Sequence, residues 1–228
     1  QGVGVNISGN ATRNDFTSQL NDDTHVDVQV TSVYLQDEVT LSESVKMVLG
    51  ARVDEFDITV VNVKNAGERR SRKDSEVSPR AGLIYKPQEN VSIYASYSES
   101  FLPRSGEQFA NINGDKNQLD PDTYSNRELG LKWDISGRLN VSAAIFEIES
   151  SSPQVADSDP STLDVIDSTI EGFEAQVNGQ LTDDWGVAVG YSYLDGEVVD
   201  EFGATGRRLR ELPQNMFSVW STHQVTPR

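Results

Sequence analysis

The connections between the predicted strands of this chain alternate between very short links and long polar loops. The short links are expected at Leu41–Ser44, Pro87–Asn90, Ser136–Arg138 and Thr182–Asp184. The long loops are expected at roughly Asn62–Glu76, Pro103–Pro121, Ser151–Asp167 and Asp195–Leu212. A soluble sandwich mixes its loop lengths, whereas a transmembrane barrel sorts them, because its two rims face different compartments. The alternation therefore predicts an all-β, antiparallel, up-and-down transmembrane β-barrel segment.

About nine strands are expected, and residues 1–24 read as a loop rich in Gly, Asn, Ser and Asp. The strands are placed near Val26–Val39, Val45–Val60, Val77–Lys86, Val91–Leu102, Asp122–Asp134, Leu139–Ser150, Ser168–Leu181, Trp185–Val198 and Gln214–Val225. Several of these segments exceed the five or six residues of a common strand, which favours a barrel over a sandwich.

Apolar and polar residues alternate along these strands. In Ser168–Leu181, the residues Phe173, Ala175, Val177 and Leu181 alternate with Glu174, Gln176, Asn178 and Gln180. The polar face of the predicted sheet also carries ionisable residues that a dry core could not hold unpaired: Lys46, Arg52, Glu128, Lys132 and Glu174. A wide lumen that holds water or a plug tolerates such residues.

Aromatic residues gather at both ends of the apolar face. Tyr85, Trp133 and Trp185 lie beside short links, and Tyr97 and Tyr193 lie toward the long loops. From Trp185 to Tyr193 a strand rises about 26 Å, or about 20 Å of height when it is tilted, near the ~25 Å apolar band of an outer-membrane barrel. The rings are therefore interpreted as two interfacial girdles. The alternative is ordinary packing on a sheet face.

The composition excludes several classes of protein. No stretch approaches 18 consecutive apolar residues, so a transmembrane helix is excluded. The net charge of −17 argues against a nucleic-acid partner. The acidity suits solvated loops, with divalent-cation bridging to anionic lipid headgroups as the functional alternative.

No catalytic constellation is found. The chain has no cysteine, and its two histidines, His25 and His223, lie far apart in sequence. No catalytic residue, cofactor or metal site is therefore expected, and the prediction is that the protein is not an enzyme. The series Asn111, Asn113, Asp115 and Asn117 lacks the Gly and the terminal Glu of an EF-hand and is interpreted as turn chemistry.

Four segments, in order along the chain, resemble the barrel of TonB-dependent ferric-siderophore receptors. They are VYLQDEVTLSESVKMVLGARVDEFD (33–57), SPRAGLIYKPQENVSIYASYSESFLPRSGEQFA (78–110), LDPDTYSNRELGLKWDI (119–135) and TIEGFEAQVNGQLTDDWGVAVGYSYLDGEV (169–198). The run FLPRSGEQF is closest to the catecholate type. The resemblance implies a barrel of about 22 strands around an N-terminal plug.

The plug, the box that engages TonB and the end of the barrel are not recognised in residues 1–228, so this chain is expected to be part of a receptor barrel domain and to form an open curved sheet. The resemblance implies an outer-membrane protein, a monomer, whose partners are a ferric siderophore, outer-membrane lipid with lipopolysaccharide, and the TonB complex through the plug. Iron would be carried as cargo.

Basic residues are concentrated in the predicted long loops, at Arg69, Arg70, Arg72, Lys73, Arg104, Arg207, Arg208 and Arg210. An anionic ferric catecholate would suit arginine, which offers planar, multi-donor contacts. The hypothesis is that ligand capture uses Arg104, Gln108, Phe109, Arg207 and Arg208. The alternative is that these arginines pair with acids such as Asp74 and Glu211, or with lipopolysaccharide phosphates.

The function predicted is import of a ferric siderophore through the outer membrane, driven by TonB. Two other classes stay open at this stage: a passive porin-like channel without a plug, and a secreted all-β adhesin or binding module. A plug and a TonB box would exist only in the first class, and only an adhesin would stay soluble without detergent.

Overall fold

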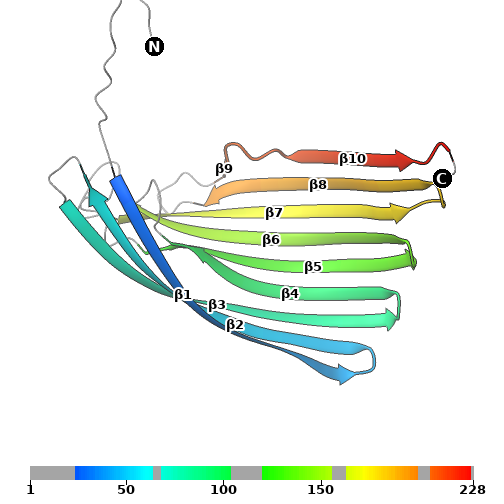
Figure 1. The fold of residues 1–228 in the computed structure, drawn as a ribbon, viewed down its shortest axis with the longest axis horizontal. Coiled ribbons are helices and arrows are strands. Elements are labelled where there is room, and N and C mark those ends of the chain that lie inside the picture. Colours follow the sequence, from blue (N-terminus) through cyan, green and yellow to red (C-terminus); the bar gives the residue numbers. More distant parts are fainter. Residues whose placement is uncertain (1–23, 64–67, 104–119, 156–162, 200–205, 227–228) are drawn as a thin grey trace, which may run out of the picture.

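The computed structural model describes residues 24–63, 68–103, 120–155, 163–199 and 206–226, and these residues form one antiparallel sheet of ten strands. The strands are β1 (Thr24–Ser42), β2 (Val45–Asn62), β3 (Glu68–Gln88), β4 (Val91–Leu102), β5 (Asp122–Ser136), β6 (Leu139–Val155), β7 (Leu163–Gln180), β8 (Trp185–Val199), β9 (Arg207–Arg208) and β10 (Asn215–His223). Each long strand pairs with the next long strand along the chain, and β9 pairs only with β8 (Figure 1).

The four short links are confirmed. Tight connections join β1 to β2, β3 to β4, β5 to β6 and β7 to β8, and all four lie at the same end of the sheet (Figure 1). The link between β5 and β6 places Gly137 in open space, where a Cβ atom would meet nothing within 4 Å. Tight turns at one end fix an up-and-down order, because antiparallel neighbours can be joined by hairpins of two to five residues.

Several long loops predicted from the sequence are wrong, because the strands continue through them. β3 begins at Glu68 rather than near Val77, and β6 and β7 reach Val155 and Leu163. The segment Glu68–Glu76 is highly polar, which reads as a loop, yet it pairs residue by residue with the apolar upper part of β2. Most of the predicted loop Pro103–Pro121, and residues 1–23, lie outside the described residues.

The sheet is a single open layer, as expected for part of a larger barrel. β1 pairs only with β2, and β10 pairs only with β8, so both are edge strands. Leu131 and Phe173, which a sandwich would seal in its core, are 37% and 38% exposed. Only Ile58, Val60 and Ala144 are buried hydrophobic residues among those described, so the sandwich alternative is excluded.

A small apolar cluster lies on the long extension of the first strands. Ile58 and Val60 of β2 are buried there, with Val26 and Phe56 packed against them. The ring of Phe56 also meets Phe101 of β4 edge-on, with 5.4 Å between centroids. This cluster stabilises the part of β1–β3 that rises beyond the apolar face, away from the short turns.

Candidate functional site

The outer face of the sheet carries a continuous apolar band. Cross-strand pairing places Ala95, Leu129, Ile145, Phe173 and Tyr193 side by side on β4 to β8. Phe173 and Tyr191 also stack at a tilt, with 6.4 Å between their ring centroids. Directly opposite residues of antiparallel strands point to the same face, so this row is one surface.

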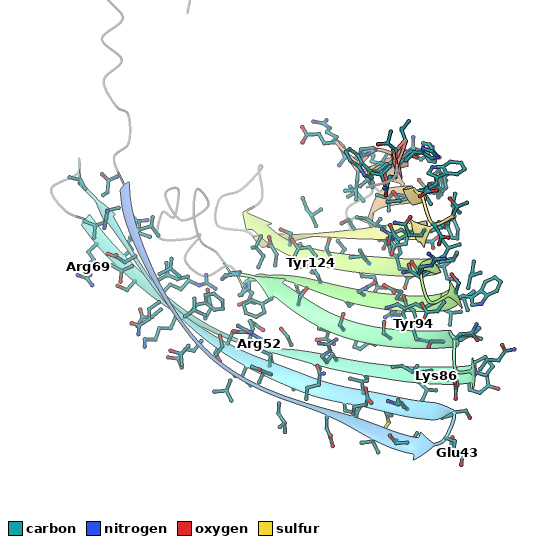
Figure 2. All side chains as sticks on the ribbon, turned by 45° about the vertical axis from the view of Figure 1, so that its right-hand side comes forward. Glu43, Arg52, Arg69, Lys86, Tyr94 and Tyr124 are labelled. Atoms are coloured by element: carbon teal, nitrogen blue, oxygen red, sulfur yellow. The ribbon has the colours of Figure 1, made fainter. Side chains whose placement is uncertain are left out.

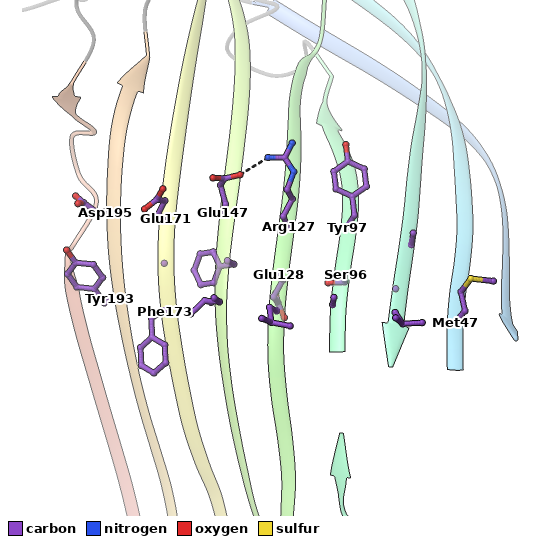
Figure 3. A pocket seen from close by; sticks show the side chains of 18 of the residues that line it. Met47, Ser96, Tyr97, Arg127, Glu128, Glu147, Glu171, Phe173, Tyr193 and Asp195 are labelled. Atoms are coloured by element: carbon purple, nitrogen blue, oxygen red, sulfur yellow. Dashed lines mark hydrogen bonds and ion pairs between the residues drawn. The ribbon is translucent and has the colours of Figure 1, made fainter. Parts of the chain in front are cut away.

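The band ends abruptly in charge on the side of the long connections. The next row holds Tyr97, Arg127, Glu147, Glu171 and Asp195, again as cross-strand partners (Figure 3). The Arg127 guanidinium lies 2.6 Å from Glu147 and 3.2 Å from Glu149. On β2 and β3 the outer face turns polar next to Val53 and Val77, where Glu55 pairs opposite Ser75 and Asp57 opposite Lys73.

The rings predicted as a lower girdle lie at the other end of this band. Tyr85, Trp133 and Trp185 are 47%, 43% and 42% exposed, each next to a short turn. The indole nitrogen of Trp185 donates a hydrogen bond to the Ser221 hydroxyl at 2.8 Å. Each ring thus shows an apolar body on the outer face, and Trp185 also satisfies its polar group locally.

A hollow of about 1040 Å³ is a wide shallow depression on this outer face. Leu49, Leu83 and Leu129 line it. Figure 3 shows Met47 and Phe173, which also line it, below the charged row. Its size does not make it a cargo site, because its floor belongs to the apolar band that runs across seven strands.

The inner face is polar and holds a second hollow of about 700 Å³. Its lining includes Tyr94, Glu128, Lys132, Glu174 and Gln176, contributed by β4, β5 and β7. The Tyr94 hydroxyl donates a hydrogen bond to Glu128, and the Lys132 ammonium lies 5.3 Å from the centroid of the Tyr94 ring. Three of the five ionisable residues that the sequence assigned to a wet interior, Glu128, Lys132 and Glu174, therefore line one hollow.

Two aromatic residues on this wall lie over glycines of the neighbouring strand. A Cβ atom on Gly172 would be 2.3 Å from the ring of Phe146, and one on Gly130 would be 2.3 Å from the ring of Tyr94. Phe146 breaks the polar pattern of β6 in the sequence, and the structure shows why it is tolerated: its ring fills the space that a side chain at Gly172 would occupy.

Farther from the short turns, the inner face of β1 and β2 holds a hydrogen-bonded group around Asp54, which is 4% exposed. Arg52 donates from Nε to both carboxylate oxygens of Asp54, at 2.9 and 2.8 Å, and from Nη2 to the Ser32 hydroxyl at 2.8 Å. Ser32 in turn donates to Asp54. The hydrogen bond from Arg52 holds the pKa of Asp54 below its ordinary value.

A second Arg–Asp pair of the same spacing lies on β3. Arg72 and Asp74 are 2.6 Å apart, and their side chains are only 10% and 5% exposed. The alternative that the arginines pair with acids such as Asp74 is therefore confirmed for Arg72. Lys73, on the opposite face, lies 3.0 Å from Asp57, and the hydrogen bond to Asp57 raises the pKa of Lys73.

The predicted capture residues are only partly described. Arg104, Gln108 and Phe109 lie outside the described residues. Arg207 and Arg208 form β9, where Arg208 pairs opposite Glu197 and lies 3.6 Å from Asp195 of the outer charged row. Arg207 pairs opposite Val198, on the inner face. The structure thus separates two residues that the sequence had grouped.

The sequence analysis did not predict that Arg52 pairs with Asp54 or that Arg72 pairs with Asp74, although the spacing of these residues indicates both pairs. Arg52 and Asp54, like Arg72 and Asp74, are two residues apart, a spacing that places both side chains on one face of a strand.

No three His, Asp or Glu side chains of the described ranges are arranged to hold a metal ion. Within the same ranges, no helix is long and apolar enough to cross a membrane.

Comparison with known proteins identifies one family, which agrees with the open β-sheet described above. The family model described as "TonB dependent receptor-like, beta-barrel" matches residues 2–227. The chain is 32% identical, over 92% of its length, to a protein of Acinetobacter baumannii named as the probable TonB-dependent siderophore receptor PiuA, and 29% identical, over 89%, to the metal-pseudopaline receptor CntO of Pseudomonas aeruginosa.

The crystal structure of PiuA superimposes with a TM-score of 0.79 at 31% identity, covering 90% of this chain and 32% of that one. The chain spans 31% of the length of the PiuA sequence and 29% of that of CntO. The described sheet therefore corresponds to roughly one third of such a relative.

Proposed function

Because the chain belongs to the TonB-dependent receptor β-barrel family, we propose that it forms part of the wall of an outer-membrane receptor that imports a ferric siderophore. Residues 1–228 supply one stretch of the barrel domain. The remaining strands and the plug are supplied by other parts of the receptor. The observation that carries this function is the division of each strand into an apolar outer face and a charged inner face.

The apolar band suits lipid, and the polar wall suits a water-filled or plugged interior. On the outer face, the girdles of Tyr85, Trp133 and Trp185 on one side and Tyr193 on the other suit the two membrane interfaces. The charged row of Arg127, Glu147, Glu171 and Asp195 then stands at the level of the lipopolysaccharide headgroups. In this proposal the receptor is a transporter and works as a monomer.

In this proposal iron is transported as cargo, bound to a chelator, and is not held by the protein as a cofactor. PiuA is named as a siderophore receptor, and CntO as a receptor for a metal-pseudopaline complex, so a chelated metal is the common theme among these relatives. A catecholate chelator remains our prediction, based on FLPRSGEQF at residues 101–109. Energy for import comes from the TonB complex, which acts through the plug.

Capture at the rim uses Arg104, Gln108, Phe109, Arg207 and Arg208 in this proposal. The two described arginines provide a matched pair, because Arg207 shares the inner face with Val198 while Arg208 is held by Asp195 on the outer face. Arg207→Ala is expected to weaken cargo binding more than Arg208→Ala. Equal binding by both variants and the wild type would rule out a capture role for this segment.

The test of function is growth under iron limitation. A strain deleted for the intact receptor is complemented with it and supplied with a panel of ferric siderophores. Rescue by at least one of them, lost when TonB is removed, is the expected result. Rescue without TonB would indicate a passive porin-like channel, and a protein that stays soluble without detergent would indicate an adhesin.

A further inference from the structure

The part of β3 that lies farthest from the short turns separates from its neighbour β4. The two strands pair from Arg80, opposite Ser98, toward the short turn, and no pair joins them beyond Arg80 in the described residues. From that point β3 stays paired with β2 as far as Glu68. Figure 2 shows β1–β3 running away from the remaining strands toward Arg69. The described sheet therefore has an open edge here, separate from those of β1 and β10.

Pro79 explains where the pairing stops. The Lys86 nitrogen donates to the Ser44 carbonyl at 2.7 Å, so the even-numbered residues of β3 direct their N–H groups toward β2. Odd-numbered residues direct theirs toward β4, and the next of these after Ala81 is Pro79, which has no N–H group to donate. Tyr97, the partner of Ala81, belongs to the charged row, so the strands separate where the apolar band ends. Unpaired backbone groups would be costly in hydrocarbon, and here they lie beyond it.

The odd-numbered residues from Arg69 to Val77 present their backbone N–H and C=O groups to the open side, and these groups form the free edge of β3. None of them pairs on that side with another described strand. The side chains of these residues are exposed as well. The free edge is about 26 Å long at the usual rise of a strand, enough for a partner strand of ordinary length. A row of unpaired backbone groups is a template for another extended chain.

The charge of the free edge selects the partner. Residues 69–73 hold three arginines and one lysine and no acid, in a chain whose net charge is −17. Lys73 already pairs with Asp57, whereas Arg69 lies opposite Val61 and makes no ion pair within the described residues. A second receptor in the same membrane stands the same way up, so its β3 would lie parallel at the same height and set cations against cations, which is unfavourable. The complementary partner is a segment with acidic residues beside Arg69.

We propose that the free edge of β3 is a docking site for an acidic, extended polypeptide segment that adds to the sheet as a strand. Backbone hydrogen bonds to the odd-numbered residues give affinity, and the cations at 69–73 select acidic side chains. The other end of the segment is uncharged, because Asp74 and Glu76 lie beside that part of the edge. The inference rests on the proposed function only for the orientation of the sheet, which makes the partner a protein outside the cell.

The experiment measures binding of a labelled peptide to the intact purified receptor by fluorescence anisotropy. The probe is a capped peptide of about eight residues. It alternates Val with Thr in its N-terminal half and Glu with Thr in its C-terminal half, because an antiparallel strand would set the C-terminal half beside Arg69. The wild type is expected to bind it. The same peptide with methylated backbone nitrogens keeps its charge but loses its N–H donors, and it is expected to bind at least about tenfold more weakly.

Two variants separate the backbone from the charge. Ser75→Pro removes an N–H group of the free edge and leaves the ladder with β2 intact, since Ser75 directs that group away from β2. It is expected to weaken binding about fivefold, the loss of one hydrogen bond. Arg69→Glu reverses the unpaired cation and is expected to weaken binding about fivefold as well. Arg138→Glu is the matched control and should bind as the wild type does, because Arg138 lies in a turn at the opposite rim, paired with Asp183.

Equal binding of the parent and methylated peptides would overturn strand addition, and this comparison uses the wild type, so it does not depend on the folding of a variant. Unchanged affinity in Ser75→Pro or in Arg69→Glu would also overturn the proposal, as would a wild type that does not bind the peptide. Self-association that Ser75→Pro abolishes would assign the edge to a second copy instead. Both variants should grow on ferric siderophores as the wild type does. Growth of the wild type on none of them would refute the proposed function without changing the peptide result.

Discussion

The two faces of β7 share one backbone and differ in almost everything else. Phe173 and Ala175 belong to the outer apolar band, while Glu174 and Gln176 line the inner hollow. Hydrogen bonding between strands is the same for both sets, so pairing does not distinguish them. The side chains on the two faces of this sheet therefore suit two different solvents: hydrocarbon on the outer side and a wet interior on the inner side.

The largest effect is expected from a charge placed on the outer face in the middle of the band. Ala175→Arg should destabilise the intact receptor in a bilayer by about 2–4 kcal/mol, the cost of a basic residue near the membrane midplane. Gln176→Arg, one residue away on the inner face, is the control and should cost far less. Chemical unfolding in phospholipid vesicles measures both. Equal costs would mean that the two faces see the same solvent.

A smaller effect is expected where a ring lies over a glycine on the inner wall. Gly172→Ala would place a methyl group against the ring of Phe146 and should cost about 1–3 kcal/mol, as overpacking does. Gly82→Ala is the control, because the nearest atom to its Cβ position is 3.7 Å away. The same unfolding assay checks both variants. A neutral Gly172→Ala would show that Phe146 does not lie over the glycine.

Acid should weaken the group around Asp54. Since the pKa of Asp54 is lowered in the folded protein, its stabilising contribution is present above the ordinary Asp pKa of about 3.9 and is lost as the pH falls through the lower, folded value. Asp54→Asn removes the stabilising contribution of the ionised carboxylate. The difference in unfolding midpoint between wild type and variant should therefore shrink below about pH 4. A difference that stays constant with pH would contradict the hydrogen-bonded carboxylate.

The smallest effect is expected from the charged row above the band. Arg127 lies between Glu147 and Glu149, and all three side chains are substantially exposed. Exposed ion pairs contribute little and are screened by salt. Arg127→Gln should leave the unfolding midpoint nearly unchanged at physiological salt. A large loss of stability would show that this row is buried against another part of the receptor.

The sequence was most informative where the membrane imposes a rule. Alternation such as Phe173–Glu174 and the tight link at Gly137 were readable, because lipid requires an apolar residue at every second position and hairpins require short turns. The segment Glu68–Glu76 was misread as a loop, since above the apolar band the outer face no longer needs apolar residues. There, pairing with β2 alone maintains the strand.

The candidate site was harder to predict for a related reason. Arg207 and Arg208 are adjacent in sequence and were grouped, but neighbours on a strand point to opposite faces, and Arg208 joins Asp195 on the outer side. Ser32 and Asp54 are distant in sequence, and only the register of β1 with β2 brings them together. Local patterns report the face of a residue, whereas cross-strand neighbours depend on register.

The most direct test of the two-solvent account is a cysteine scan of β7, since this chain contains no cysteine of its own. Single cysteines at positions 173 to 178 of the intact receptor would carry an environment-sensitive fluorophore in lipid vesicles. We predict that lipid-soluble quenchers act at 173, 175 and 177, and water-soluble quenchers at 174, 176 and 178. Quenching without this alternation, or protection of all six positions from both quenchers, would contradict the account.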